Sequence, residues 1–218
     1  MVRLETRRLI VRHGRMADVA SITRYARENQ EFLAPWEPLR HETWFTEDYW
    51  RMRLALDVQE YYQDQSLRLL LIPRQSPGEV AGVANFTNVL RGSFQACHLG
   101  YALAARYVGQ GLMTEALGAA LDFVFREMRL HRVMAAHLPE NERSAAVLRR
   151  LGFQKEGLAR DYLLIGGRWR DHVLNSKLAP DWRPGPGEAF LVSPCGNAVS
   201  PECPSDAGDL SGPGSRVF

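Results

Sequence analysis

The sequence has few cysteines, little net charge and no long apolar run. Its three cysteines, Cys97, Cys195 and Cys203, are widely spaced among 218 residues, so neither a disulfide framework nor a zinc site is indicated. A formal net charge of +2 disfavours a dedicated nucleic-acid-binding protein, in which a strong basic bias is expected. Residues 1–33 lack the apolar stretch of a signal peptide or a membrane helix. We therefore expect a reduced, cytoplasmic protein without a metal, a membrane partner or sequence-specific contact with nucleic acid.

The composition divides the chain into a folded part and a tail. Apolar residues make up 45% of the sequence, which suits one compact domain. After Trp182 the composition changes, because residues 183–218 contain six glycines, six prolines and five serines. Such a segment cannot bury enough apolar surface to offset its chain entropy. We expect one domain over residues 1–182 and a disordered Gly/Pro/Ser-rich tail over residues 183–218.

Within residues 1–182, short aliphatic runs alternate with stretches of helical periodicity. Asp18 and Thr46 are expected to be the N-caps of the first two helices. The pattern predicts an α/β domain with a mixed sheet, in which antiparallel hairpins flank one β-α-β crossover. The expected strands cover residues 8–13, 67–72, 80–89, 95–103, 132–138, 161–165 and 168–178, and the later helices cover 110–128 and 142–151.

The most informative local motif is "RYVGQGLMTEAL" at residues 106–117. It follows an expected strand and opens an expected helix, so its free backbone N–H groups and the helix dipole favour an anion such as phosphate. Gly109 and Gly111 would allow a ligand to approach the backbone closely. The motif lacks the Gly-Lys-Ser/Thr end of a Walker loop, and Thr114 replaces the third glycine of a Rossmann fingerprint. The remaining readings are a different phosphate loop or an ordinary strand-to-helix turn.

The Arg-x-x-Gly-x-Gly pattern in this context resembles the acetyl-CoA loop of the GNAT acetyltransferase superfamily. A second GNAT-like motif, "NERSAAVLRRLGF" (141–153), follows the next expected strand. The stretches "FLAPWEP" (32–38), "LGFQKEG" (151–157) and "DYLLIGGRWRDHVL" (161–174) are similar to the RimJ branch of this superfamily. The resemblance runs from about Val2 to Trp182. It implies the GNAT fold, a mixed and mostly antiparallel sheet that splays around the central crossover.

The RimJ branch comprises bacterial enzymes that acetylate the N-terminal alanine of a small-subunit ribosomal protein. The resemblance therefore implies acetyl-CoA as co-substrate, direct attack in a ternary complex, and a protein partner with a free N-terminus. It also suggests contact with the ribosome or with an assembly intermediate. Two alternatives stay open, namely acetylation of another amine, such as a lysine, a polyamine or a drug, and a CoA-binding domain without catalysis.

The resemblance also places the co-substrate on particular residues. Pantetheine would pair with the backbone of a strand whose edge is freed by the splay, although the same residues could form an ordinary core strand. Asn141 is either the cap of its helix, a pantetheine ligand or both. The expected cofactor-binding residues are Leu99, Gly100, Tyr101, Arg106, Val108, Gly109, Gln110, Gly111, Leu112, Met113, Asn141 and Ser144.

The catalytic residues are harder to assign. Many GNAT enzymes place a proton-donating tyrosine at the position that Leu148 occupies here. Ser144 is the best substitute, one turn earlier on the same helical face, but it could equally serve only the helix terminus. Asp161, at the expected start of a strand, is our candidate base, against the alternative of a solvated carboxylate. His172 could act as base by its residue type, or belong to the sheet with Asp171 as its partner.

The acceptor side is predicted from the loop "FLAPWEP". Phe32, Trp36 and Glu37 are expected to bind the substrate, and the two prolines stiffen the loop. Glu37 could pair with the acceptor's α-ammonium group. Trp36 could instead only anchor the loop on the core.

Overall fold

A computed structural model describes residues 1–183, in which strands and helices alternate. The strands are β1 (Arg3–Glu5), β2 (Leu9–Arg12), β3 (Leu67–Pro73), β4 (Gly82–Leu90), β5 (Ala96–Leu103), β6 (Arg132–His137), β7 (Gln154–Ile165) and β8 (Arg168–Leu178). The α-helices are α1 (Val19–Glu28), α2 (Gln30–Leu33), α3 (Glu47–Tyr62), α4 (Leu112–Arg126) and α5 (Glu142–Arg150), with short 3-10 turns at Met16–Asp18, Glu42–Phe45 and Ala105–Tyr107. Among these described residues, no helix is long and apolar enough to span a bilayer.

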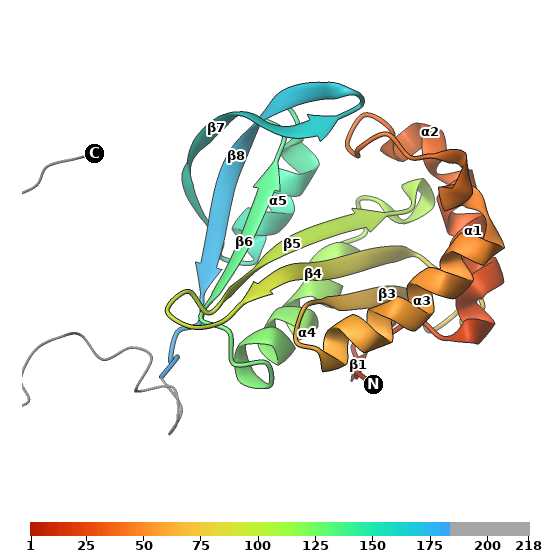
Figure 1. Cartoon of the computed structure of the whole chain (residues 1–218), viewed down its shortest axis with the longest axis horizontal. Helices are drawn as coiled ribbons and strands as arrows, with labels where there is room; N and C mark the ends of the chain where they lie inside the picture. The colour runs from red at the N-terminus through yellow and green to blue at the C-terminus, as the bar shows by residue number, and fades with distance from the viewer. Residues whose placement is uncertain (184–218) are drawn as a thin grey trace, which may run out of the picture.

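The strands form one 8-stranded sheet in the order β1-β2-β3-β4-β5-β6-β8-β7. Every neighbouring pair is antiparallel except β5 and β6, which are parallel because α4 carries the chain across from one to the other. The two parallel strands pair only between Ala96–His98 and Arg132–Met134. Beyond these residues they fan apart, as Figure 1 shows. The predicted fold, including the splayed crossover, is confirmed.

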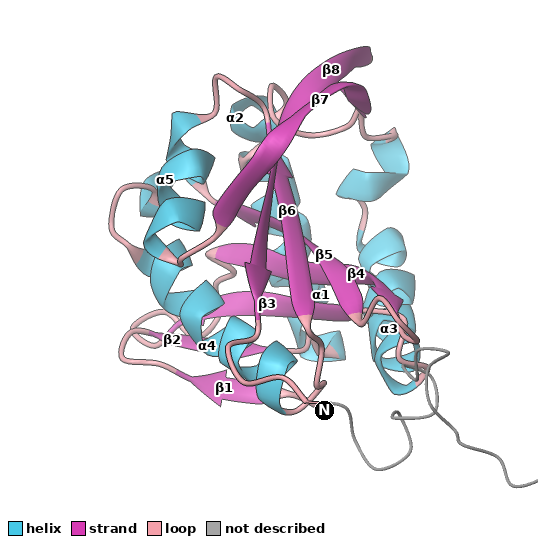
Figure 2. Cartoon of the chain, turned by 90° about the vertical axis from the view of Figure 1, so that its left-hand side faces the viewer, coloured by secondary structure: helices cyan, strands magenta, loops and turns pink. Residues whose placement is uncertain are grey.

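Helices cover both faces of the sheet. On one face α4 and α5 pack in a core that includes Leu69, Leu71 and Leu117, and on the other α1 and α3 pack against Leu70 and Ile72. Figures 1 and 2 show α4 and α5 on one side of the strands and α1 and α3 on the other. Successive residues of β3 therefore face different cores, which explains why this strand is apolar at nearly every position.

The apolar periodicity of the sequence predicted the bounds of most helices and strands to within a few residues. The predicted helix 110–128 is α4, and its expected apolar face is buried at Leu112, Ala116, Leu117, Ala120, Leu121 and Val124. Thr46 caps α3 as predicted, because its hydroxyl oxygen accepts a hydrogen bond from the N–H of Tyr49 at 3.3 Å. The two-glycine turn at Gly166 and Gly167 joins β7 and β8, and both residues have positive φ.

Three local predictions were wrong or incomplete. The Asp18 side chain makes no capping bond to α1, because its carboxylate binds the guanidinium of Arg12 with both oxygens, at 2.6 and 2.8 Å. Strand β7 begins at Gln154, well before the predicted residue 161. Strand β1 was not predicted at all, since only three residues belong to it. The predicted disordered tail lies almost wholly outside the described residues.

Candidate active site

A large cleft lies where β5 and β6 part. Strand β4 stays paired with β5 as far as Leu103, and β8 stays paired with β6 as far as His137. Between them, the β6-facing backbone edge of residues 99–103 has no ladder partner in the described chain. The cleft has a volume of about 950 Å³. An unpaired strand edge along such a cleft can hydrogen-bond an extended, amide-containing ligand.

One end of the cleft is formed by the glycine loop before α4. Gly109 and Gly111 have φ values of 80° and 74°, a left-handed conformation that favours glycine. Gly111 is the N-cap of α4 and offers no side chain to the helix terminus. The first N–H groups of α4 therefore remain available to an anionic ligand. Five of the predicted loop residues line the cleft, namely Val108, Gly109, Gly111, Leu112 and Met113.

The two other predicted loop residues, Arg106 and Gln110, do not line the cleft. The Arg106 guanidinium pairs with Glu79 at 3.1 Å, and the Gln110 side-chain amide donates to the carbonyl of Arg106 at 2.9 Å. The guanidinium of Arg8 donates to the carbonyl oxygen of Gln110 at 2.8 Å, a contact that the sequence did not predict. These side chains shape the loop, while a contact from the N–H groups of Arg106 and Gln110 to a ligand stays a prediction.

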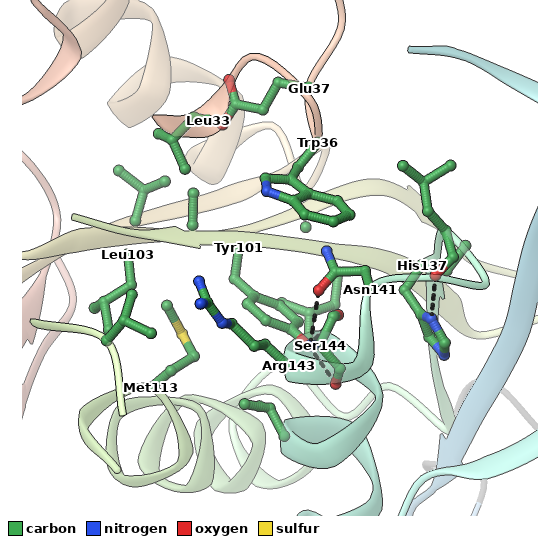
Figure 3. Close-up of a pocket in the computed structure, with 18 of the residues that line it drawn as sticks. Leu33, Trp36, Glu37, Tyr101, Leu103, Met113, His137, Asn141, Arg143 and Ser144 are labelled. Carbon is green, nitrogen blue, oxygen red and sulfur yellow. Dashed lines mark hydrogen bonds between the residues drawn. The ribbon is translucent and has the colours of Figure 1, made fainter. Parts of the chain in front are cut away.

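The start of α5 lines the middle of the cleft. Asn141 caps this helix, because its side-chain oxygen accepts a hydrogen bond from the N–H of Ser144 at 3.1 Å. Across the cleft floor the hydroxyl groups of Tyr101 and Ser144 lie 2.7 Å apart (Figure 3). Burial raises the pKa of Tyr101 to about 12, although its hydrogen bond with Ser144 acts in the opposite direction. Leu148, one turn further along α5, is 1% exposed and belongs to the apolar core.

The opposite wall comes from α2 and the loop that follows it. Phe32, Trp36 and Glu37 all line the cleft, as do Leu163 and Leu164 of β7. The carbonyl of Glu37 accepts a hydrogen bond from the N–H of Gly166 at 3.1 Å, which ties this loop to the tip of the β7–β8 hairpin. Figure 3 shows Trp36 and Glu37 above β5, on the side away from Ser144. The cleft is therefore lined by α4 and α5 at one end and by α2 at the other, and we call these ends its two mouths.

Two histidines line the cleft as well. The Nδ1 atom of His137 lies 2.9 Å from the carbonyl oxygen of Leu138, and that of His172 lies 2.9 Å from the carbonyl oxygen of Arg170. A carbonyl group only accepts hydrogen bonds, so Nδ1 carries the hydrogen in each ring. In the neutral imidazole, Nε2 is then a free acceptor. Neither Nε2 atom has a hydrogen-bond partner in residues 1–183.

The two histidines lie on different faces of the sheet. Cys97 pairs with Val133, and His137 pairs with Val173, so alternation places the side chain of His137 on the α4 and α5 face with Tyr101. By the same alternation His172 lies on the face that carries α2 and the loop with Trp36. His172 is only 3% exposed.

Comparison with known proteins identifies the family. The sequence profile of the "Acetyltransferase (GNAT) domain" family matches residues 8–154. This chain is a GNAT acetyltransferase. It is 47% identical to the [Ribosomal protein uS5]-alanine N-acetyltransferase of Escherichia coli strain K12, over 84% of this chain and 94% of that protein.

Solved structures support the same assignment for this GNAT chain. The ribosomal-protein-S5-alanine acetyltransferase of Vibrio fischeri superposes with a TM-score of 0.81 at 38% identity, covering 84% of this chain and 100% of that one. The RimJ protein of Mycobacterium smegmatis, solved in complex with CoA-disulfide, has a TM-score of 0.76 at 31% identity, covering 87% of this chain and 91% of that one.

The cleft of this GNAT acetyltransferase fits CoA in shape and chemistry. The uncapped terminus of α4 offers N–H groups to a pyrophosphate, and the free edge of β5 offers peptide groups to the pantetheine arm. A Cβ atom built on Gly109 or Gly100 would meet no atom within 4 Å, so nothing fills the space beside either glycine. Among the described residues, no group of histidine, cysteine and acidic side chains could hold a metal ion.

Several predicted site residues need correction. Asp161 does not open a strand but lies within β7, in a bulge between Ala159 and Leu163, with φ of 45°. It does not line the cleft, so the structure gives no support to its predicted role as base. The predicted partnership of His172 with Asp171 was also wrong, because an Asp171 carboxylate oxygen accepts from the N–H of Asp161 at 2.9 Å.

Arg40 differs from a freely solvated surface charge. Its guanidinium lies 3.9 Å above the centre of the Trp44 ring and 3.1 Å from a Glu37 carboxylate oxygen. Arg40 also lines the cleft beside Glu37. The sequence offered no spacing rule for this contact, because residues 37–40 lie in the loop after α2 and not in a helix.

Proposed function

We propose that this chain transfers the acetyl group of acetyl-CoA to the α-amine of an N-terminal alanine on a small-subunit ribosomal protein. The observation that carries the proposal is the 47% identity that extends over 94% of the E. coli enzyme. The two-mouthed cleft supports it, because donor and acceptor can enter from opposite faces of the sheet and meet between β5 and β6.

We further propose that the transfer is direct, within a ternary complex. In that step the bond between the amine nitrogen and the acetyl carbon forms, the carbon–sulfur bond breaks, and the sulfur leaves as a thiolate. Cys97 is the cysteine among residues 1–183, and it is fully buried. Burial raises its pKa to about 12, so it is a poor nucleophile for an acetyl-enzyme intermediate.

The acceptor's own chemistry limits how much help the protein must give. An α-amine has a pKa near 8 and a lysine side chain one near 10.4. At pH 7 roughly a tenth of α-amines are neutral, against well under a thousandth of lysines. A single proton acceptor on the acceptor side is therefore sufficient. His172 fits this role better than Asp161, since it lines the cleft on the α2 face and has a free Nε2 atom.

Glu37 is the group that we place beside the incoming ammonium. Its carboxylate lies at the acceptor mouth, shared with Arg40, and its backbone is fixed to the hairpin at Gly166. Trp36 forms the adjoining apolar surface, which suits a small alanine side chain. These side chains also constitute the contact surface that we propose for the protein partner.

The test combines acetyl-CoA with each of three acceptor peptides, or with spermidine, and measures thiol release. One peptide begins with alanine, the second is identical but has a blocked α-amine and an internal lysine, and the third begins with a bulky residue. We expect turnover with the first peptide and little with the others. Turnover only with the lysine peptide or with spermidine would refute the proposed acceptor, and tight CoA binding without turnover of any amine would favour the non-catalytic alternative. Intersecting initial-velocity lines support the ternary complex, whereas parallel lines contradict it.

A further inference from the structure

Tyr101 and Ser144 form a hydroxyl pair that joins β5 to α5 beneath the cleft. The two hydroxyl oxygens lie 2.7 Å apart, and the Tyr101 hydroxyl is also 3.2 Å from the carbonyl oxygen of Ser144. The main chain of Ser144 is fixed from the other side by the Asn141 cap. Both elements that border the cleft, β5 and α5, therefore fix the position of the pair.

Two arrangements of the hydrogen atoms satisfy these distances. In the first, Tyr101 donates to the carbonyl of Ser144, and Ser144 donates to the Tyr101 oxygen. In the second, Tyr101 donates to the Ser144 hydroxyl oxygen, and the Ser144 hydrogen is free to point into the cleft. Only hydroxyl rotation separates the two arrangements, so a negative charge arriving in the cleft would select the second.

Hydroxyl groups are scarce in the lining of the cleft. The lining side chains that carry one are Tyr101, Ser144 and Thr114, and Thr114 lies in the first turn of α4. The next turn of α5 presents Leu148, which is buried in the core and has no proton to donate. Among the lining hydroxyl groups, those of Tyr101 and Ser144 are therefore the ones that lie beside α5.

We propose that Tyr101 is a positioning residue for the leaving thiolate, because it donates to the Ser144 hydroxyl oxygen and so directs the Ser144 hydrogen at the sulfur. This inference rests on the proposed acetyl transfer. The sulfur keeps the electron pair of the broken carbon–sulfur bond and accepts a hydrogen bond. Burial makes Tyr101 a weak acid with a pKa of about 12, so the pair keeps both of its protons and the free thiolate is protonated by water after release.

The first test does not depend on turnover. The protein is saturated with CoA, and the thiol of the bound ligand is titrated by the ultraviolet absorbance of its thiolate. We expect a lower thiol pKa in the wild-type complex than in free CoA. Tyr101→Phe and Ser144→Ala should each raise it by about half a unit to one unit, because each removes part of a hydrogen bond to charge. A thiol pKa that Tyr101→Phe leaves unchanged would overturn the proposal, whatever the effect of Ser144→Ala.

The second test is a double-mutant cycle on acetyl transfer. Tyr101→Phe should lower kcat about tenfold while KM for acetyl-CoA changes less than about threefold, because the interaction forms mainly as charge develops on sulfur. The double variant should be no slower than Ser144→Ala, since Tyr101 acts through Ser144. Additive losses would show that Tyr101 acts independently, and would refute the positioning role.

Matched controls separate a specific effect from general damage. Tyr61→Phe changes a half-buried tyrosine that does not line the cleft, and Ser176→Ala removes a hydroxyl that donates to Glu156 instead. Both should leave the thiol pKa and kcat unchanged. If no amine is acetylated at all, the proposed function fails, but the thiol titration still decides the role of the pair. If Tyr101→Phe does not fold, an unchanged thiol pKa in Ser144→Ala still overturns the proposal, because Tyr101 acts only through Ser144.

Discussion

Replacing Gly109 by alanine tests whether the loop before α4 binds a phosphate through its backbone. Gly109 has φ of 80°, and an added Cβ would meet no atom within 4 Å. The penalty is thus conformational rather than steric. A non-glycine residue in the left-handed region costs about 1–2 kcal/mol. For a chain of this size, that loss lowers Tm by about 2–8 °C.

The same substitution should weaken CoA binding by more than it weakens folding. If the alanine shifts the backbone, one charge-assisted hydrogen bond from the loop to the pyrophosphate is lost, which costs about 1.5–3 kcal/mol. We expect Kd for CoA to rise about 10- to 100-fold in isothermal titration calorimetry. Raising the salt concentration should narrow the difference in Kd between the wild type and Gly109→Ala, since the lost contact is with an anion.

Gly118→Ala is the matched control. Gly118 lies inside α4, its added Cβ would also meet nothing within 4 Å, and its φ is not positive. Alanine in a helix interior stabilises by about 0.5–1 kcal/mol relative to glycine, so this variant should melt slightly higher and bind CoA normally. An unchanged Kd for Gly109→Ala would refute the location of the cofactor loop, and equal Kd changes in both variants would mean that the effect is not local to the loop.

Three further predictions concern the acceptor base, the N-terminal turn and acid stability. His172→Asn should lower kcat with the alanine peptide at pH 7 and shift the pH profile, whereas Asp161→Asn should change neither, and the reverse result would restore Asp161 as the base. Glu115 accepts hydrogen bonds from the Thr6 hydroxyl, the Arg8 N–H and the Arg8 side chain, so Glu115→Ala should lower the free energy of unfolding by about 1–3 kcal/mol in urea. Glu5→Ala removes only surface ion pairs with Arg3 and Arg74 and should hardly move the urea midpoint. Equal shifts in the two variants would contradict this reasoning. Burial lowers the pKa of His13 to about 4, below its unfolded value near 6.5. This residue should therefore contribute stability above pH 6.5 that is lost as the pH falls toward 4. His13→Gln should flatten the plot of urea midpoint against pH between these values, and an unchanged slope would show that His13 does not titrate in this way.

The sequence predicts the features of this fold that depend on neighbouring residues. Apolar periodicity located α4, and the glycine pair placed the β7–β8 turn. Residue type alone could not locate the bulge in β7, where Asp161 takes a positive φ and the Asp171 carboxylate binds its N–H. That arrangement depends on the register of β7 against β8, which a linear pattern does not encode. The predicted strand began seven residues late because β7 lies at the sheet edge, where residues 154–160 are mostly exposed and form no apolar run.

The candidate site shows the same distinction between local features, which the sequence predicts, and long-range contacts, which it does not. Its local parts, the glycine loop and the Asn141 cap, are each set within a few residues and were predicted. Contacts between distant segments were missed or assigned wrongly. The Tyr101–Ser144 pair joins residues 43 apart, and the position of His172 depends on its strand lying beside β6. The sequence pointed to the Ser144 side chain, because Leu148 replaces the usual tyrosine, but it named Tyr101 only as a main-chain contact to the cofactor.

The different capping of α4 and α5 supports the proposal that α4 binds the phosphate and that α5 serves the chemistry. Both helices begin at the cleft, and both present their positive ends to it. In α5 the Asn141 side chain already occupies the N–H of Ser144, so that terminus offers less to an anion. In α4 the N-cap is Gly111, which has no side chain, and its positive φ lets the loop turn without a capping residue. An anion therefore gains more at α4, while the cap on α5 holds Ser144 in place for its hydrogen bond with Tyr101.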